Sequence, residues 1–183
     1  LADCHEIYDM IVSLSANLRY TIKGGELVRL QEELDYVDRY ILLQKTRLGG
    51  RLEVTKKINP KVNLAVIPKI SIQMLVENAI IHGMPENGAV LHIIIRVCLE
   101  NNRLLISLYD DGKGILPEKV KELNDIFSGK SADTGNSIGL PNLASRLKIL
   151  YQGEAGLFLE SQGDQFTEVK MELPIRKRGN ENV

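Results

Sequence analysis

Three short polar motifs interrupt apolar stretches of this chain, and their residue types can bind a ligand. In the first motif, Asn78 and His82 are four residues apart, so they share one face of a predicted helix whose other positions are mostly apolar. A buried side-chain amide without a partner is costly, so this face is expected to meet a polar group. A solvated helix end is the alternative for this motif taken alone.

The second motif is Asp110-Asp111-Gly112-Lys113-Gly114, which directly follows an apolar strand. Its two glycines allow the backbone to approach a ligand closely. A carboxylate at a strand end can accept a hydrogen bond from an amino group, such as the exocyclic amine of a purine. An Asp-Gly pair also marks ordinary turns, and that interpretation stays open here.

The third motif is a glycine-rich loop, residues 135–142, that runs into the start of a helix. Free backbone N–H groups and the helix dipole at such a position favour a phosphate chain. A flexible loop before a helix is an equal alternative for this motif alone.

Several other motifs are excluded. Gly129-Lys130-Ser131 resembles the end of a phosphate-binding loop, but Asn124 stands where that loop needs its first glycine. A dinucleotide-binding fingerprint would need a glycine at Pro117. No cluster of Cys and His residues offers a metal cage.

Composition narrows the class of protein. The chain has 183 residues, with 23 Lys+Arg against 24 Asp+Glu and 44% apolar residues. This suits one globular domain with a small appendage and argues against a nucleic-acid binder. Cys4 and Cys98 form no disulfide framework, which favours a reducing compartment. Apolar runs are too short to span a membrane, and a start at Leu1 suggests a piece of a longer protein.

The elements that must position the motifs divide into two zones. Apolar residues recur at spacings of three and four over residues 7–18 and 27–41, which predicts two successive helices ending at glycine pairs. Their seam predicts a helical hairpin that packs on itself or contributes half of an intermolecular four-helix bundle.

From Arg51 onward, strands and helices alternate irregularly, and the pattern predicts an α+β sandwich. Strands are expected over residues 51–58, 89–99, 103–109, 155–161 and 166–173, helices over residues 69–82, 117–124 and 141–151, and a mobile loop over residues 127–137.

Together and in this order, the motifs resemble a known family. The segments "LVENAIIHG" (75–83), "DDGKGI" (110–115) and "GNSIGLPNLASRL" (135–147) are similar to the N, G1 and G2 boxes of histidine-kinase ATP-binding domains. These belong to the gyrase, Hsp90, histidine kinase and MutL ATPases. The segment "LSANLRY" and residues 27–52 are most similar to the LytS/YesM-like branch of two-component sensor kinases. The resemblance implies a two-layer α/β sandwich, the Bergerat ATP-binding fold, preceded by a helical hairpin.

The resemblance also implies a role for individual residues. Asn78 would bind Mg²⁺ through its amide oxygen, Asp110 would select adenine, and His82 would belong to the nucleotide pocket. Residues 127–137 would close over the triphosphate. The further ATP-binding residues that the resemblance implies are Gly112, Gly114, Ile115, Lys130, Gly135, Ser137, Gly139, Leu140 and Thr167.

Three departures from the family pattern bear on activity. Ser137 occupies the middle position of a box that often reads Gly-x-Gly-x-Gly, and Phe166 replaces the glycine that commonly precedes the threonine. Gyrase-type ATPases carry a water-activating glutamate four residues before the asparagine, but this position is Met74. We therefore expect weak ATP hydrolysis, with the γ-phosphoryl kept for a protein nucleophile.

The phosphoryl acceptor is expected outside this chain. Its three histidines are His5, His82 and His92, and the branch places its acceptor in an Asn-Pro-His-Phe segment that would fall before Leu1. His82 is assigned to the pocket, His92 to a strand, and His5 to a helix surface. We therefore assign none of the three histidines as a catalytic residue, and we expect that the chain does not phosphorylate itself.

The sequence thus predicts a catalytic portion of a sensor histidine kinase. Residues 1–48 would be a partial dimerisation hairpin, 49–176 the ATP-binding domain and 177–183 a tail. The expected cofactors are ATP and Mg²⁺, and the expected partners are a response-regulator receiver domain and, in the intact protein, a second copy. The portion would be cytoplasmic and joined to a membrane through other segments. The rivals are a serine kinase of the anti-sigma-factor type and a degenerate nucleotide-sensing or dimerisation module.

Overall fold

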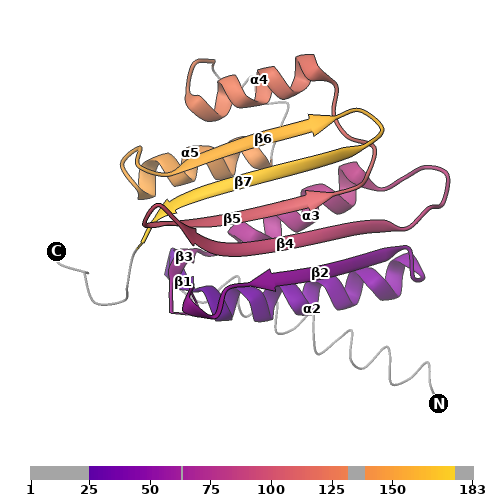
Figure 1. Ribbon diagram of the computed structural model, residues 1–183, viewed down its shortest axis with the longest axis horizontal. Coiled ribbons are helices and arrows are strands. Elements are labelled where there is room, and N and C mark those ends of the chain that lie inside the picture. The colour runs from indigo at the N-terminus through magenta and orange to yellow at the C-terminus, as the bar shows by residue number, and fades with distance from the viewer. Residues whose placement is uncertain (1–24, 63, 132–138, 176–183) are drawn as a thin grey trace.

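A five-stranded mixed sheet forms one layer of the protein (Figure 1). The computed structural model describes residues 25–62, 64–131 and 139–175. The strands of the large sheet run in the order β2-β4-β5-β7-β6, and only the β2–β4 pair is parallel. Their bounds are β2 Leu52–Ile58, β4 Leu91–Glu100, β5 Arg103–Asp110, β6 Gly156–Gln162 and β7 Phe166–Pro174.

Apolar alternation gives this sheet one buried face. In β4, Leu91, Ile93, Ile95 and Val97 are buried, while the side chains between them are exposed or half-buried. The same period of two holds along β7. The predicted turn between β4 and β5 is confirmed, because Asn101 and Asn102 both have left-handed φ angles, as a two-residue hairpin turn requires.

Helices make the second layer. Figure 1 shows α3 and α5 behind the sheet, α4 beside β6 and α2 beside β2. Their apolar faces join the buried face of the sheet in one hydrophobic core. The predicted α+β sandwich is therefore confirmed. The helices are α2 Leu30–Leu48, α3 Ser71–Gly83, α4 Pro117–Ser128 and α5 Leu140–Leu150, with a short 3-10 turn, η1, at Pro60–Val62.

The apolar residues of α2, which were predicted to pack in a helical hairpin or bundle, pack instead against α3 and the sheet. Leu30, Leu34, Val37 and Ile41 of α2 are buried in the same core as α3 and the sheet. A seam with spacings of three and four suits packing on a sheet and a helix as well as on another helix. The boundary expected between residues 48 and 49 therefore does not separate two cores here. The first helix of the predicted hairpin, residues 7–18, lies outside the described residues.

A second, two-stranded sheet was not predicted. Strand β1, Leu27–Arg29, pairs antiparallel with β3, Val66–Pro68, in a segment expected to be helix and loop. Leu27 therefore lies in a strand, and the helix begins three residues later. This pairing is long-range in sequence, so no local pattern marks it.

The segment after α4 is shorter than expected. Phe127 and Ser128 form the last turn of α4, and Gly129 ends the helix with a left-handed φ of 78°. Residues 132–137 of the predicted loop lie outside the described residues. Among the described helices, none combines the length and apolar character that crossing a membrane requires.

Candidate functional site

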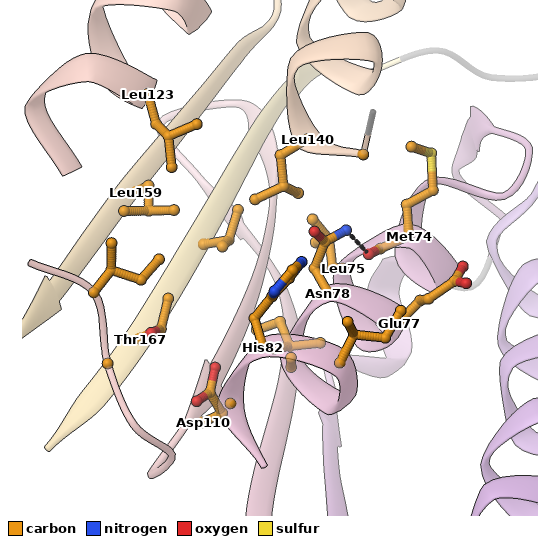
Figure 2. A pocket seen from close by; sticks show the side chains of 18 of the residues that line it. Met74, Leu75, Glu77, Asn78, His82, Asp110, Leu123, Leu140, Leu159 and Thr167 are labelled. Atoms are coloured by element: carbon orange, nitrogen blue, oxygen red, sulfur yellow. Dashed lines mark hydrogen bonds between the residues drawn. The ribbon is translucent and has the colours of Figure 1, made fainter. Parts of the chain in front are cut away.

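A pocket of about 860 Å³ lies between the helices and the sheet. Side chains from α3, α4 and α5 face side chains from β5, β6 and β7 across it (Figure 2). This size is typical of a small-molecule site. Of the predicted site residues, the pocket is lined by Asn78, His82, Asp110, Gly114, Ile115, Gly139, Leu140 and Thr167.

Asp110 is the buried charge of this pocket. It ends β5, on the face that points toward the helices, and it is 2% exposed. Burial raises the pKa of its carboxyl to about 6, while a hydrogen bond from the Gly112 backbone N–H acts in the opposite direction. The neighbouring Asp111, the first residue after β5, is exposed and contacts His92, with a distance of 2.7 Å from Oδ2 to Nδ1. The two adjacent carboxylates therefore have different surroundings, one buried and one exposed.

The loop after Asp110 is held by close backbone contacts. Gly83, at the end of α3, accepts a hydrogen bond from the Lys113 backbone N–H at 3.1 Å. A Cβ on Gly83 would lie 2.7 Å from Asp110 Oδ1, and a Cβ on Gly112 would overlap the Gly83 backbone. Gly114 has a left-handed φ of 64° and lies against the Gln162 carbonyl. The glycines therefore let α3 and the β6–β7 turn approach the carboxylate. Gly112 itself is buried beneath the pocket and does not line it.

A hydroxyl pair supports the sheet side of the pocket. Thr167 of β7 pairs in register with Asp110 of β5, so the two side chains are neighbours on one face. Ser161 Oγ lies 3.1 Å from Thr167 Oγ1, accepts a hydrogen bond from the Ile115 N–H and donates to the Phe166 carbonyl. Ser161 thus ties Thr167 to the wall formed by Ile115.

Asn78 occupies the helix side. Its amide nitrogen donates to the Met74 carbonyl at 2.6 Å, and Figure 2 shows its oxygen on the side away from Met74. Gly139, at the start of α5, lies directly against this amide, because a Cβ there would come 2.9 Å from Asn78 Nδ2. The asparagine and the N-terminus of α5 are therefore adjacent, as the order of the motifs implies.

Glu77, next to Asn78, points elsewhere. Figure 2 shows its carboxylate directed away from the centre of the pocket. Its charge, after desolvation by burial, helps to raise the pKa of Tyr40 on α2 to about 12. Glu77 therefore faces α2, which agrees with the expectation that it makes a poor substitute for the glutamate missing at Met74.

Lys130 does not line this pocket, and its predicted role in ATP binding stays a prediction. Lys130 is exposed and lines a separate hollow between α4, α5 and β6. Lys113 and Lys119 border the main pocket instead, although each pairs with a nearby glutamate, Glu86 or Glu122. These two lysines were not predicted, since surface lysines carry no signal in a sequence. Gly135 and Ser137 lie outside the described residues.

Other residues of the site were also missed. The apolar lining includes Leu108, Leu123, Leu159 and Val169, which the sequence marks only as core positions. Gly83 had a visible signal, because it ends the first motif, but only the fold shows that it faces Asp110. Ser161 had none, since a serine in an edge strand is common.

Comparisons with known proteins agree with this geometry. Residues 68–177 match the family of histidine kinase-, DNA gyrase B- and HSP90-like ATPases, and residues 1–52 match a histidine kinase family. Because the first match covers more than half of the chain, the chain belongs to the histidine kinase-, DNA gyrase B- and HSP90-like ATPases.

Relatives narrow the branch. Sensor protein LytS of Bacillus anthracis is 28% identical over 181 residues, which cover 98% of this chain and 30% of LytS. Sensor histidine kinase YpdA of Escherichia coli (strain K12) is 38% identical over 148 residues, which cover 78% of this chain and 24% of YpdA. The resemblance to LytS-like sensor kinases is thereby confirmed, and the chain spans less than a third of the length of these relatives.

Solved structures share the fold. The catalytic domain of histidine kinase ThkA superposes with a TM-score of 0.59 at 16% identity, covering 83% of this chain and 96% of that one. The histidine kinase domain of a blue-light-activated kinase from Erythrobacter litoralis gives a TM-score of 0.55 at 17% identity, covering 93% of this chain and 75% of that one.

Proposed function

We propose that this chain is the ATP-binding catalytic portion of a two-component sensor histidine kinase. The observation that carries the proposal is the pairing of a buried carboxylate, Asp110, with a side-chain amide, Asn78, on opposite sides of one pocket. The carboxylate suits the amino group of a purine, and the amide suits a hydrated cation on a phosphate chain.

Adenine would lie on the sheet side. Ionised Asp110 accepts a hydrogen bond from the exocyclic amine, and Thr167 stands beside it on β7. Ile115, Leu108 and Val169 supply apolar surface for the base. Guanine carries a carbonyl oxygen in place of that amine and would face the carboxylate with an acceptor, so adenine is preferred.

The donor set suits magnesium held mainly by phosphate and water. No group of three or more His, Cys, Asp or Glu side chains that could hold a metal occurs in the described parts of the chain. Asn78 would hold the ion through its oxygen, since its nitrogen is engaged by Met74. Such a sparse set fits a cation that keeps its waters. When bound, Mg²⁺ neutralises phosphate charge.

The γ-phosphoryl would go to a histidine rather than to water. Met74 offers no general base where gyrase-type relatives have a glutamate, and Glu77 faces α2. Nucleophilic attack by an imidazole nitrogen forms a P–N bond as the bond to ADP breaks.

The acceptor histidine is proposed to lie outside the described residues. His82 lines the pocket and His92 contacts Asp111 on the opposite face of the sheet, so neither is assigned that role. We propose that the phosphoryl then passes to an aspartate of a receiver domain, and that the intact protein acts as a dimer attached to a membrane.

The proposal is tested by titrating the chain with Mg-ATP and Mg-GTP in a calorimeter. We expect binding of Mg-ATP and at least tenfold weaker binding of Mg-GTP, as expected when an acceptor faces an acceptor. A folded chain without affinity for either nucleotide would favour a degenerate module instead.

Phosphoryl transfer is tested with labelled ATP. The chain alone is expected to take up no label, while a longer protein that carries the acceptor should take up acid-labile label. Acid-stable label would indicate a serine kinase of the anti-sigma-factor type. Acid-labile label on this chain that is lost in His5→Ala would place the acceptor within it.

A further inference from the structure

Glu33 is a fully buried carboxylate in α2 that the nucleotide pocket does not explain. It is 0% exposed and lies among apolar residues of the core. Burial of a carboxylate is costly unless hydrogen bonds compensate it. Its oxygens accept hydrogen bonds from the backbone N–H groups of Ile70, Ile72 and Gln73, at 2.8, 3.1 and 3.4 Å.

These three N–H groups belong to the start of α3, the helix that carries Asn78. Helix N-termini are normally capped by a side chain of the residue that precedes them. Here that residue is Ile70, which has no capping side chain and adopts a left-handed φ of 66° that is unfavourable for a β-branched residue. The cap therefore comes from another helix, 37 residues earlier in the chain.

Hydrogen bonds continue from this cap to the pocket. The Ile70 N–H donates to Glu33, the Ile70 carbonyl accepts from the Met74 N–H at 3.1 Å, and the Met74 carbonyl accepts from the Asn78 side chain at 2.6 Å. The amide that faces the pocket is thus three hydrogen bonds away from the carboxylate on α2. The link between the two side chains is mechanical, because the backbones of Ile70 and Met74 join these hydrogen bonds.

The same junction is held from the opposite side by α5. Arg146 donates to the carbonyl of Lys69 at 2.7 Å and to that of Glu26 at 3.2 Å. Helix α5 begins at Leu140, beside Asn78. The junction between β3 and α3 therefore receives hydrogen bonds from side chains of both α2 and α5.

We propose that Glu33 is a positioning residue that couples the placement of α2 to the Asn78 amide and thereby to the binding of magnesium nucleotide. The inference rests on the proposed function, because it assigns the magnesium to Asn78. A displacement of α2 against α3 would weaken the cap, release Ile70 from its left-handed conformation and shift Asn78. The base-binding side would be spared, since Asp110 and Thr167 are held by the sheet.

The test compares Glu33→Gln with Glu32→Gln, the exposed neighbour on the same helix. Affinity for Mg-ATP is measured by calorimetry and affinity for adenosine by NMR titration. Glu33→Gln is expected to weaken Mg-ATP binding by about tenfold, as for loss of a hydrogen bond to a charged group, and adenosine binding by less than about twofold. Glu32→Gln should change neither.

A purely structural role predicts another result. If Glu33→Gln weakens Mg-ATP and adenosine binding equally, or leaves Mg-ATP binding within twofold of the unaltered chain, the inference is overturned. The double variant with Asn78→Ala adds a second criterion. Coupling predicts that it binds Mg-ATP no worse than Asn78→Ala alone, whereas independent roles predict that the two losses multiply.

A variant that does not fold and a chain that binds no Mg-ATP each have a defined consequence for the inference. If Glu33→Gln does not fold, Glu33→Asp is tested in its place with the same measurements and criteria. This variant keeps the carboxylate on a side chain that is one methylene shorter. If the unaltered chain binds adenosine but no Mg-ATP, the assignment of magnesium to Asn78 and this inference both fail. Equal Mg-ATP binding by the unaltered chain and the Glu33 variant overturns the inference alone.

Discussion

The two sides of the pocket are built from different kinds of structure. On the sheet side, Asp110 and Thr167 are partners in the antiparallel β5–β7 ladder, which continues along the whole of β5. On the helix side, Asn78 belongs to α3, and Gly139, the residue that precedes α5, lies against its amide. The sheet side is therefore expected to hold its geometry with or without ligand, while the helix side can respond to elements that pack against α3 and α5.

Asp110→Ala should give the largest effect, because it removes the only buried carboxylate among the residues described as lining the pocket. Loss of a charged hydrogen bond in a desolvated site is expected to weaken adenosine binding by roughly a hundredfold. Calorimetry measures the change. Thermal unfolding should show no loss of stability, since the variant no longer buries a charge.

The matched control is Asp111→Ala, on the exposed face of the same strand end. It should leave adenosine affinity unchanged. Equal losses in the two variants would show that the strand end as a whole, and not the buried carboxylate, is needed.

Asn78→Ala should separate the two sides. It is expected to weaken Mg-ATP binding by about tenfold and to leave adenosine binding within about twofold, because the proposal assigns the amide to the metal and not to the base. Calorimetry in magnesium and NMR titration with adenosine measure the two affinities. Asn87→Ala, in the exposed loop after α3, is the control. A comparable loss of adenosine affinity in Asn78→Ala would remove the distinction between the sides.

Binding on the sheet side should depend on pH. Burial raises the pKa of Asp110 to about 6, and the proposed hydrogen bond from the adenine amine requires the ionised carboxylate. Affinity should therefore be constant above pH 7 and fall by about tenfold between pH 7 and pH 5, where most of the carboxyl is protonated. Titration with adenosine at both pH values measures this, and Asp110→Asn should show weak binding without the pH dependence. A flat profile in the unaltered chain would contradict the assignment.

Thr167→Val should have the smallest effect. It keeps the shape of the side chain and removes one neutral hydrogen bond, so adenosine binding should weaken by about fivefold. Thr55→Val, on the exposed edge strand β2, is the control. NMR titration suits these modest changes. An unchanged affinity in Thr167→Val would mean that the Thr167 hydroxyl does not contribute to adenine binding and that Asp110 recognises the base without it.

Local patterns predicted most of the secondary structure, and the three motifs supplied several of the residues that line the pocket. Period-two alternation marks β4 and β7, and apolar spacing marks α3, because burial on one face imposes those periods. The grouping of Asn78, Asp110 and Gly139 came from the resemblance of three ordered motifs, since no local pattern brings residues so far apart together.

The misses share a physical cause. The β1–β3 pair and the burial of α2 against α3 depend on contacts between segments distant in the chain. Apolar residues at helical spacing, as in α2, indicate that one face of the helix is buried. They do not indicate which other element covers that face. Lys130, which the resemblance places among the ATP-binding residues, follows the Gly129 turn at the end of α4 and lines a separate hollow, so its role stays a prediction.

By itself, the sequence determined the alternation of elements, the glycines around Asp110 and several of the polar residues that line the pocket, since these follow from local sterics and burial. Only the tertiary structure decided that Asp110 is desolvated while Asp111 is not, that Glu77 faces α2, and that Glu33 caps α3. The reason is that burial and capping depend on which distant segment of the chain comes to lie beside a side chain. The sequence shows that a residue is Asp or Glu, and it does not show whether its carboxylate is in water or in the core.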